Sequence, residues 1–412
     1  MSPIGLPQAA ARSLPLPRGA SALLEHRRQF PALANKLYAN FGVAGPMARS
    51  TLEALTRHYQ QQQELGPSGP AVFTAQAQAD DDLRRDLGAL LEVEPKRLAL
   101  TDSTCTGCSA VLLAIPWRAG DQLLLSDAEY PALLQLARLL ARRSGVEVIT
   151  VPLLGRAHEA EALVAAALTP RTRALLFSQV LWTSGEQVDV GALAALVAGR
   201  TPRPLLLIDG AQGPGNVLAR PAADGVDAYA FPGHKSLCGP DGIGALYLAG
   251  RLLEGDEALE PMTAGWRGVR VDASGAAAGW AAGARRFEAS TTTFGTRPAL
   301  REALRVADEF APIAARCARV AGLVERAFHA VRAAGFATFL EAPPGTSLLA
   351  FRVPGVPVNT VAAALLRERM VVRALPQTDV VRLSLGYLTT EDEVDALVAA
   401  LARRARSGDW TS

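Results

Sequence analysis

The most informative segments of the sequence are Leu205-Leu-Leu-Ile-Asp-Gly-Ala-Gln212 and, later in the chain, Phe231-Pro-Gly-His-Lys235. The aliphatic residues before Asp209 form a continuous apolar run, which predicts a strand buried on both faces. Asp209 ends this strand, and Lys235 follows the next predicted strand. In α/β proteins ligands bind at the carboxyl ends of the strands, so we expect both side chains at one binding edge.

On both sides of these segments, short apolar strands alternate with helices in the sequence pattern. The predicted strands cover 97–101, 122–125, 146–151, 174–177, 205–208, 228–231 and 244–247. The predicted helices cover 48–63, 76–91, 108–115, 131–143, 159–167 and 190–197. Continuous apolar strands that alternate with helices predict a mostly parallel sheet covered on both faces.

After Pro298 the pattern changes to a second, smaller α/β unit. A long helix over 299–334 is expected to break near Pro312, and the last helix is preceded by Thr389-Thr-Glu-Asp392, which favours a capping box. The elements predicted there are strands 347–353, 370–373 and 381–384 and helices 358–369 and 391–404. We therefore predict an N-terminal arm (1–25), a large domain (26–297) and a small C-terminal domain (298–412).

Length and composition exclude several classes of protein. The 412 residues suggest two or three domains, and 49% hydrophobic with 20% charged residues is ordinary globular composition rather than disorder. A net charge of +2 excludes nucleic-acid binding through bulk charge. No run approaches ~18 uncharged apolar residues, so no membrane span is predicted.

Four cysteines in a chain of this length do not indicate a disulfide framework. The first 20 residues carry several prolines and no secretory apolar core, so we expect a reducing, cytoplasmic setting. Cys105-Thr-Gly-Cys108 has the form C-x-x-C, but no second pair or suitably spaced histidine accompanies it. We therefore predict no metal site.

A turn of small hydroxyl residues, Asp102-Ser-Thr-Cys-Thr-Gly107, lies between a predicted strand and an apolar helix. This arrangement is typical of a phosphate site, because backbone N–H groups and the helix dipole converge on the anion. No G-x-G-x-x-G follows an early strand, and no Walker loop is present. A dinucleotide site is therefore not expected.

The remaining pattern matches the needs of pyridoxal 5'-phosphate (PLP). Its aldehyde requires a lysine, its ring nitrogen requires a carboxylate, and its phosphate requires hydrogen-bond donors. Lys235, one of only three lysines, Asp209 and the turn at 103–106 supply these groups. An amino-acid substrate also needs an arginine for its carboxylate, and Arg373 and Arg382 lie at strand ends of the small unit.

Asp209-Gly-Ala-Gln212 and Phe231-Pro-Gly-His-Lys235 together resemble the paired signatures of the class V aminotransferase fold, the cysteine desulfurase-like group. The resemblance extends in order from about Asn40 to Arg404. Segments similar to the cystine C–S lyase branch are Tyr38–Gly45, Leu100–Cys108, Leu181–Gly185 and Arg286–Thr291. The resemblance implies a PLP-dependent transferase (type I) fold, with a seven-stranded large-domain sheet, and a homodimer with shared active sites.

The resemblance also implies roles for individual cofactor-binding residues. Lys235 would form the Schiff base and move the proton at Cα, and Asp209 would pair with the pyridinium nitrogen. Gln212 would contact the ring hydroxyl oxygen, and His234 would help to bind the phosphate. Thr291 would reach the phosphate of the partner subunit.

Further roles follow from the same resemblance. The phosphate turn would consist of Thr104, Cys105 and Thr106, acting mostly through their backbone. Tyr130 would stack on the cofactor ring where the family usually has a histidine. The substrate site would contain Arg382 for the carboxylate, with Arg373, Trp182 and Phe41 nearby.

The sequence departs from the family pattern at functionally important positions. Pro232 stands where a phosphate-binding Ser or Thr is usual, and it has neither hydroxyl nor N–H. The segment Ala374–Val381 between the two arginines lacks the nucleophilic cysteine of the desulfurases. Persulfide-forming desulfuration is therefore disfavoured.

We predict a PLP-dependent carbon–sulfur lyase that performs β-elimination on L-cystine or a cysteine S-conjugate, giving pyruvate, ammonia and a sulfur product. The alternative is an aminotransferase, epimerase or other PLP-dependent step in specialised biosynthesis, because one cofactor serves all of these reactions. A scaffold protein without cofactor is disfavoured because Lys235, Asp209 and Arg382 are all present.

Overall fold

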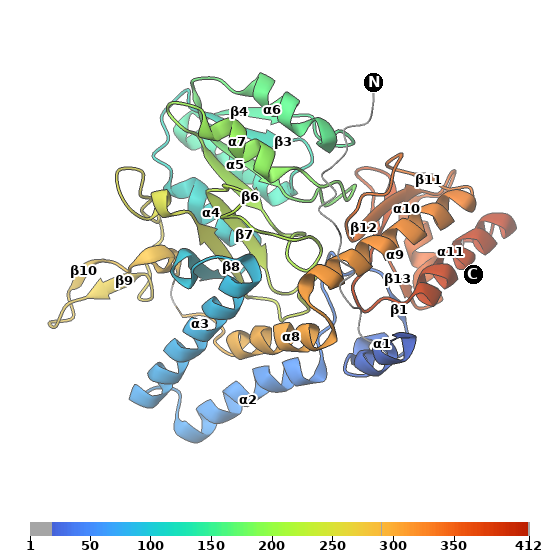
Figure 1. Cartoon of the computed structure of the whole chain (residues 1–412), viewed down its shortest axis with the longest axis horizontal. Coiled ribbons are helices and arrows are strands. Elements are labelled where there is room, and N and C mark those ends of the chain that lie inside the picture. Colours follow the sequence, from blue (N-terminus) through green and yellow to red (C-terminus); the bar gives the residue numbers. More distant parts are fainter. Residues whose placement is uncertain (1–18, 290, 411–412) are drawn as a thin grey trace.

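The computed structural model describes residues 19–289 and 291–410, which form two α/β parts lying side by side (Figure 1). The larger part is built on a seven-stranded sheet in the order β2-β8-β7-β6-β5-β3-β4. Strand β8 is antiparallel to both of its neighbours, and all other pairs are parallel, which confirms the predicted mostly parallel sheet. The strands are β2 (Leu98–Thr101), β3 (Gln122–Ser126), β4 (Glu147–Val151), β5 (Thr172–Ser178), β6 (Leu205–Asp209), β7 (Ala228–Pro232) and β8 (Gly244–Leu248).

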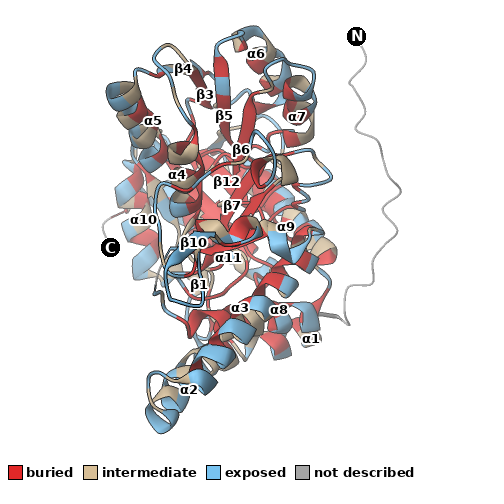
Figure 2. Cartoon of the chain, turned by 90° about the vertical axis from the view of Figure 1, so that its left-hand side faces the viewer, coloured by how far each residue is buried: buried red, intermediate tan, exposed pale blue. Residues whose placement is uncertain are grey.

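Helices cover both faces of this sheet, which is why its strands are apolar throughout. In β6, Leu205 and Leu207 belong to the hydrophobic cluster on one face, and Leu206 and Ile208 belong to the cluster on the other. Figure 2 shows the resulting pattern, with buried strands between helices whose outer surfaces are exposed. The helices around this sheet are α3 (Pro70–Leu91), α4 (Thr104–Ala114), α5 (Pro131–Ser144), α6 (Ala160–Ala167) and α7 (Val190–Ala198).

The smaller part contains a four-stranded antiparallel sheet in the order β11-β12-β15-β14. Its last helix, α11, begins with a capping box in which the Thr390 hydroxyl and the Glu393 carboxylate satisfy each other's backbone N–H groups. Its elements are α9 (Ile313–Ala333), β11 (Ala337–Thr338), β12 (Leu348–Arg352), α10 (Val358–Arg367), β14 (Arg373–Leu375), β15 (Val380–Ser384) and α11 (Glu391–Ser407).

The N-terminal segment packs against the C-terminal part of the chain. Leu23 and Phe30 share a hydrophobic cluster with Phe310 and Leu388. Strand β1 (Leu37–Tyr38) pairs with β13 (Met370–Val371). Of the predicted arm, residues 1–18 lie outside the described residues, and helix α1 (Gly19–Arg27) follows them. The predicted domain limits remain a prediction.

Several boundaries differ from the sequence prediction. Helix α4 begins at Thr104 rather than at Cys108, because the Ser103 hydroxyl accepts a hydrogen bond from the Thr106 N–H and caps an earlier turn. Helix α3 begins at Pro70 rather than at Gln76, since proline is well suited to the first helical position.

The segment after Pro298 also differs in detail. The long helix predicted over 299–334 is two helices, α8 (Thr296–Phe310) and α9, and the break is at the expected proline, Pro312. The predicted strand 370–373 is divided between β13 and β14. Helix α2 (Arg49–Leu65) and the hairpin of β9 (Val269–Val271) and β10 (Ala277–Trp280) complete the fold. Within the described ranges, no helix is both long and apolar enough to cross a bilayer.

Candidate active site

A cavity of about 260 Å³ lies at the carboxyl edge of the large sheet, where the smaller part of the chain approaches it. This is the edge at which α/β proteins bind ligands. The structure brings together there most of the residues singled out from the sequence. Those that line the cavity are Thr104, Cys105, Tyr130, Trp182, Asp209, Gln212, His234, Lys235, Arg373 and Arg382.

Asp209 lies at the end of β6 with only 4% of its surface exposed. One carboxylate oxygen accepts the Ala211 N–H at 2.7 Å, and no cation of the described residues forms an ion pair with it. Burial raises the pKa of Asp209, while the Ala211 N–H and the charge of Lys235 oppose the rise. A buried carboxylate with one neutral donor is suited to receive a cationic ligand atom.

Lys235 follows β7 and projects into the same cavity. Burial lowers its pKa to about 8; the positive charge of Arg382 adds to this effect and the negative charge of Asp209 opposes it. A lysine with this pKa is partly neutral near pH 7–8, and the neutral amine is the form that attacks an aldehyde or removes a proton.

Several buried polar atoms in the cavity wall have no partner in the structure. They are Gln212 Oε1, His234 Nδ1, Thr104 Oγ1 and Arg382 Nε. Buried polar atoms are normally hydrogen-bonded, so four such atoms around one cavity indicate a polar ligand. The Gln212 amide nitrogen, by contrast, donates to the Gly42 carbonyl at 2.7 Å, which fixes the side chain.

Two arginines face the cavity from neighbouring strands, because Arg373 of β14 and Arg382 of β15 are register partners. Arg382 is only 2% exposed and donates to the Trp182 carbonyl at 2.5 Å. Burial, followed by the nearby charge of Arg373, lowers the pKa of Arg382 to about 10. A guanidinium in this setting is suited to a carboxylate ligand.

An aromatic corner forms another wall of the cavity. Tyr130 precedes α5, and its ring meets Trp182 edge-on, with ring centres 5.8 Å apart and an interplanar angle of 78°. Tyr130 is 47% exposed, so one side of its ring is open to a ligand. A planar heterocycle is the kind of group that stacks on such a ring.

The N-terminus of α4 is the part of the site that is suited to bind a phosphate group. Thr104 and Cys105 in its first turn line the cavity, whereas Thr106 is exposed and does not. The Thr106 N–H is already bonded to the Ser103 hydroxyl at 3.1 Å, so it is not a free donor. Pro232 also lines the cavity without offering a donor.

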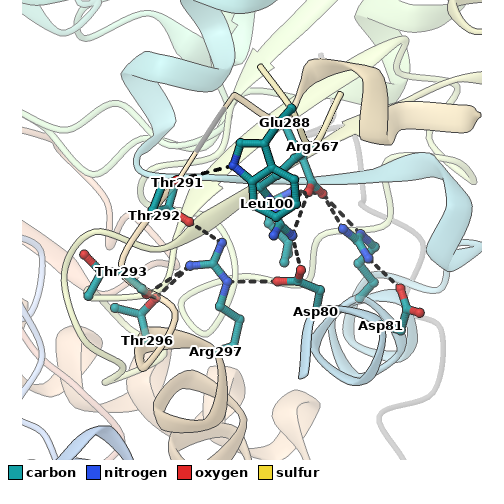
Figure 3. Close-up of polar contacts among 12 residues, drawn as sticks. Asp80, Asp81, Leu100, Arg267, Glu288, Thr291, Thr292, Thr293, Thr296 and Arg297 are labelled. Carbon is teal, nitrogen blue, oxygen red and sulfur yellow. Dashed lines mark hydrogen bonds and ion pairs between the residues drawn. The ribbon is translucent and has the colours of Figure 1, made fainter. Parts of the chain in front are cut away.

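Two further predicted residues lie away from the cavity. Phe41 is 1% exposed and packs edge-on against Tyr38, so it supports the wall without lining it. Thr291 is exposed, and its hydroxyl accepts the Trp266 indole N–H at 3.3 Å (Figure 3). Thr291 does not reach the cavity of its own chain.

The Thr291 loop is anchored by a buried ionic cluster, defined as Asp80, Arg84, Arg267, Glu288 and Arg297 (Figure 3). Asp80 pairs with Arg267 and with Arg297, the latter at 3.0 Å, and Glu288 pairs with Arg84 at 2.6 Å. Arg297 also donates to the Thr292 hydroxyl at 2.7 Å. The cluster therefore joins α3 to the start of α8, and Arg297 also fixes Thr292 and Thr293, which precede that helix.

Some cavity residues were missed from the sequence. Ser178 ends β5 directly beside Asp209 in the sheet, and Gly42 binds Gln212. The strand-end rule that selected Asp209 would also have found Ser178. Among the described residues there is no group of three or more His, Cys, Asp or Glu placed to hold a metal ion.

The fold and the cavity define the class of protein. A lysine of lowered pKa, an unpaired buried carboxylate, a helix N-terminus and a buried arginine converge on one cavity. Their chemistry fits the aldehyde, ring nitrogen and phosphate of PLP and the carboxylate of an amino acid. The protein is a PLP-dependent enzyme.

Comparison with known proteins assigns the family. Residues 45–397 match the family model described as aminotransferase class-V, and the chain belongs to this family. It is 32% identical over 396 residues to the isopenicillin N epimerase of Streptomyces clavuligerus, covering 88% of this chain and 93% of that protein. It is 27% identical to a probable cysteine desulfurase of Vibrio cholerae, covering 91% and 96%.

Solved structures agree with this assignment. The complex of the cystine C–S lyase C-DES with its product cysteine persulfide has a TM-score of 0.87 at 31% identity, covering 91% of this chain and 99% of that one. The cysteine desulfurase CsdA of Escherichia coli has a TM-score of 0.80 at 26% identity, covering 93% and 98%. A C-DES variant similar to this chain carries glycine linked covalently to PLP.

Proposed function

We propose that the protein is a carbon–sulfur lyase that performs β-elimination on L-cystine or a cysteine S-conjugate. The observation that carries this proposal is a complete set of groups for proton removal at Cα in a cavity without a reactive thiolate. Among the described residues, Cys105 is the one cysteine that lines the cavity, and burial raises the pKa of its thiol. A desulfurase needs a thiolate that can accept sulfur.

The residues of the chain would divide the work as follows. Arg382 binds the α-carboxylate of the substrate, and Arg373 adds positive charge beside it. Lys235, as the neutral amine, takes the proton from Cα. Bound PLP supplies an electron sink for the resulting carbanion, and Asp209 holds the proton on the ring nitrogen that makes the ring electron-poor.

Elimination then requires only that the sulfur group leaves Cβ. The protonated Lys235 lies in the same cavity and can return its proton to the departing sulfur. The released three-carbon fragment hydrolyses to pyruvate and ammonia. Similarity to C-DES, described as a cystine C–S lyase, supports this outcome.

We also infer that the enzyme acts as a homodimer. Thr291 is exposed and outside the cavity of its own chain; its hydroxyl accepts the Trp266 indole N–H, and its neighbour Thr292 is bonded to Arg297 of the buried ionic cluster. An anchored hydroxyl of this kind is suited to a second subunit's cofactor phosphate. Size measurement by light scattering tests this inference, and a monomer with full activity would contradict it.

Amino-acid epimerisation is the second candidate, because the chain is 32% identical to an isopenicillin N epimerase over most of both lengths. This reaction also begins with proton removal at Cα by Lys235. It then needs a proton donor on the opposite face of the substrate. The Tyr130 hydroxyl is the candidate donor among the ionisable groups of the cavity wall.

Product analysis separates these functions. The enzyme with bound PLP is incubated with L-cysteine, with L-cystine and with cysteine S-conjugates, and pyruvate, ammonia, alanine and substrate chirality are measured. The lyase should release pyruvate and ammonia in equal amounts. Alanine with a protein-bound persulfide would overturn the proposal in favour of a desulfurase, and inversion at Cα without pyruvate would favour the epimerase.

A cysteine-free variant sharpens this test. Replacing Cys105, Cys108, Cys238 and Cys317 by serine or alanine should leave elimination within about threefold of the wild-type rate, because no thiolate takes part. Circular dichroism checks that the variant folds, since three of these cysteines are buried. Loss of turnover in a folded variant would contradict the lyase mechanism.

A further inference from the structure

Glu129 is a buried carboxylate that the proposed reaction does not use. It is 2% exposed, and no cation of the described residues forms an ion pair with it. Its oxygens accept three hydrogen bonds from neutral donors: the Ser126 hydroxyl at 2.7 Å, the Ser178 N–H at 3.0 Å and the Ser178 hydroxyl at 2.6 Å. Burial raises the pKa of Glu129 to about 7, although these donors oppose the rise.

These bonds join the loop after β3 to the edge of the sheet that carries the site. Ser126 ends β3 and Ser178 ends β5, and the two strands are parallel neighbours. Ser178 is in turn the register partner of Asp209 at the end of β6. Glu129 therefore ties its loop to the strand directly beside the proposed ring-binding carboxylate.

The residue that this loop presents to the cavity is Tyr130. Tyr130 is 47% exposed, its ring meets Trp182 edge-on, and its hydroxyl forms no hydrogen bond with the described residues. The far end of the loop is held by Asp127, which accepts the N–H groups of Leu153 and Leu154 at 2.9 and 3.0 Å. The backbone next to Tyr130 is thus held by Glu129, while the ring has little support of its own.

We propose that Glu129 is a positioning residue whose hydrogen bonds to Ser178 hold the Tyr130 ring against the bound cofactor. The inference rests on the proposed stacking role of Tyr130, and it adds the residue that sets the ring's place. Because the donors are neutral, the arrangement depends on hydrogen-bond geometry and not on a charge.

This reasoning distinguishes two substitutions. In Glu129→Gln the amide oxygen can accept from the Ser126 hydroxyl and from the Ser178 N–H. The amide nitrogen can donate to the Ser178 hydroxyl, because a hydroxyl oxygen is also a hydrogen-bond acceptor. In Glu129→Ala all three bonds are lost and the Ser178 N–H is left buried without a partner. The glutamine variant should keep the loop in place, and the alanine variant should release it.

The experiment is a double-mutant cycle on cofactor affinity, measured by titrating the full-length chain with PLP and following the visible absorption band. Tyr130→Ala should weaken PLP binding about tenfold through loss of stacking. Glu129→Ala should weaken it by a similar factor, and the double variant should be no weaker than Tyr130→Ala alone. Glu129→Gln should stay within about threefold of the wild type.

Circular dichroism of the bound cofactor's visible band gives a second readout, because it reports the surroundings of the ring. The spectrum of Glu129→Ala should resemble that of Tyr130→Ala, and the spectrum of Glu129→Gln that of the wild type. A protein destabilised without displacement of Tyr130 would keep the wild-type spectrum, and that result would overturn the proposal.

Two further results would overturn the proposal: an unchanged PLP affinity in Tyr130→Ala, or full additivity of the two alanine substitutions. If Glu129→Ala does not fold, Ser178→Ala replaces it in the cycle. It removes the hydroxyl donor alone, so its effect should be about two- to threefold and should vanish in the Tyr130→Ala background. No substrate is present, so the outcome does not depend on which reaction the enzyme catalyses.

Discussion

Two buried aspartates lie at opposite ends of the strands of the large sheet, and their surroundings differ. Asp227, just before β7, is 1% exposed and binds Arg203 at 2.9 Å and Arg251 at 2.7 Å. Asp209, at the end of β6, is 4% exposed, and within the described part of the chain it accepts only the Ala211 N–H. Both are shielded from water, yet only the first is paired with cations.

The difference separates a structural charge from a functional one. A buried charge without a partner is costly, so folded proteins normally pair it, as Asp227 and the ionic cluster of Figure 3 do. Asp209, Lys235 and Arg382 lack that compensation among the described residues, and all three line one cavity. We propose that the bound cofactor and substrate supply the missing partners.

The largest loss of activity is expected when Lys235 is replaced. Lys235→Ala should lower turnover by about 10⁴-fold or more, because both covalent attachment of the cofactor and proton transfer at Cα are lost. Borohydride should no longer fix PLP to the protein. Lys96→Ala is the control, since Lys96 is exposed, and labelling at Lys36 or Lys96 in the Lys235→Ala variant would contradict the assignment.

Asp209→Asn tests the unpaired carboxylate. The amide can still accept the Ala211 N–H, so the fold should persist, and its melting temperature should be unchanged or higher because an uncompensated charge is removed. Turnover should fall by about 10³-fold, since a neutral amide does not keep the ring nitrogen protonated. Steady-state kinetics and thermal melts measure both effects; an unimpaired rate would exclude the role.

Asp227→Asn should show the reverse pattern. Two arginines lose their carboxylate, and we expect a loss of about 2–4 kcal/mol of unfolding free energy, reduced by the partial exposure of both arginines. The turnover rate per folded molecule should stay within about twofold of the wild type, because Asp227 lies at the end of the strands away from the cavity. Urea denaturation and active-site titration separate stability from rate, and a large rate loss would break the comparison.

A smaller effect concerns pH. The rate at which added PLP attaches to the cofactor-free chain should rise with pH and level off above about 8, because Lys235 must be neutral and its pKa is lowered to about 8. The negative charge of Asp209 raises that pKa, so Asp209→Asn should level off at a lower pH. Asp227→Asn should not differ from the wild type. Stopped-flow absorbance follows the attachment of PLP. If the rate of the Asp209→Asn variant levels off at a higher pH than that of the wild type, this electrostatic account is contradicted.

Much of the fold and site could be predicted from the sequence. The apolar strands, the proline break at Pro312 and the strand-end residues Asp209 and Lys235 carry local signals that do not depend on distant contacts. The start of α4 was predicted too late because a single serine, Ser103, sets it. The buried ionic cluster and the role proposed for Glu129 had no local signal, since the partners come from other elements.

The strand-helix alternation, the cofactor and the family could be inferred from the sequence, because periodicity, strand-end chemistry and paired motifs are local properties. Which buried charges have partners depends on the folded structure. Glu129 follows β3 and Asp209 ends β6, and neither position shows which groups will meet the carboxylate in the folded chain. Their difference arises because Ser178 meets Glu129 across the sheet, while the described chain brings only a backbone N–H to Asp209. Compensation of a buried charge depends on groups far apart in sequence, so folding alone brings them together.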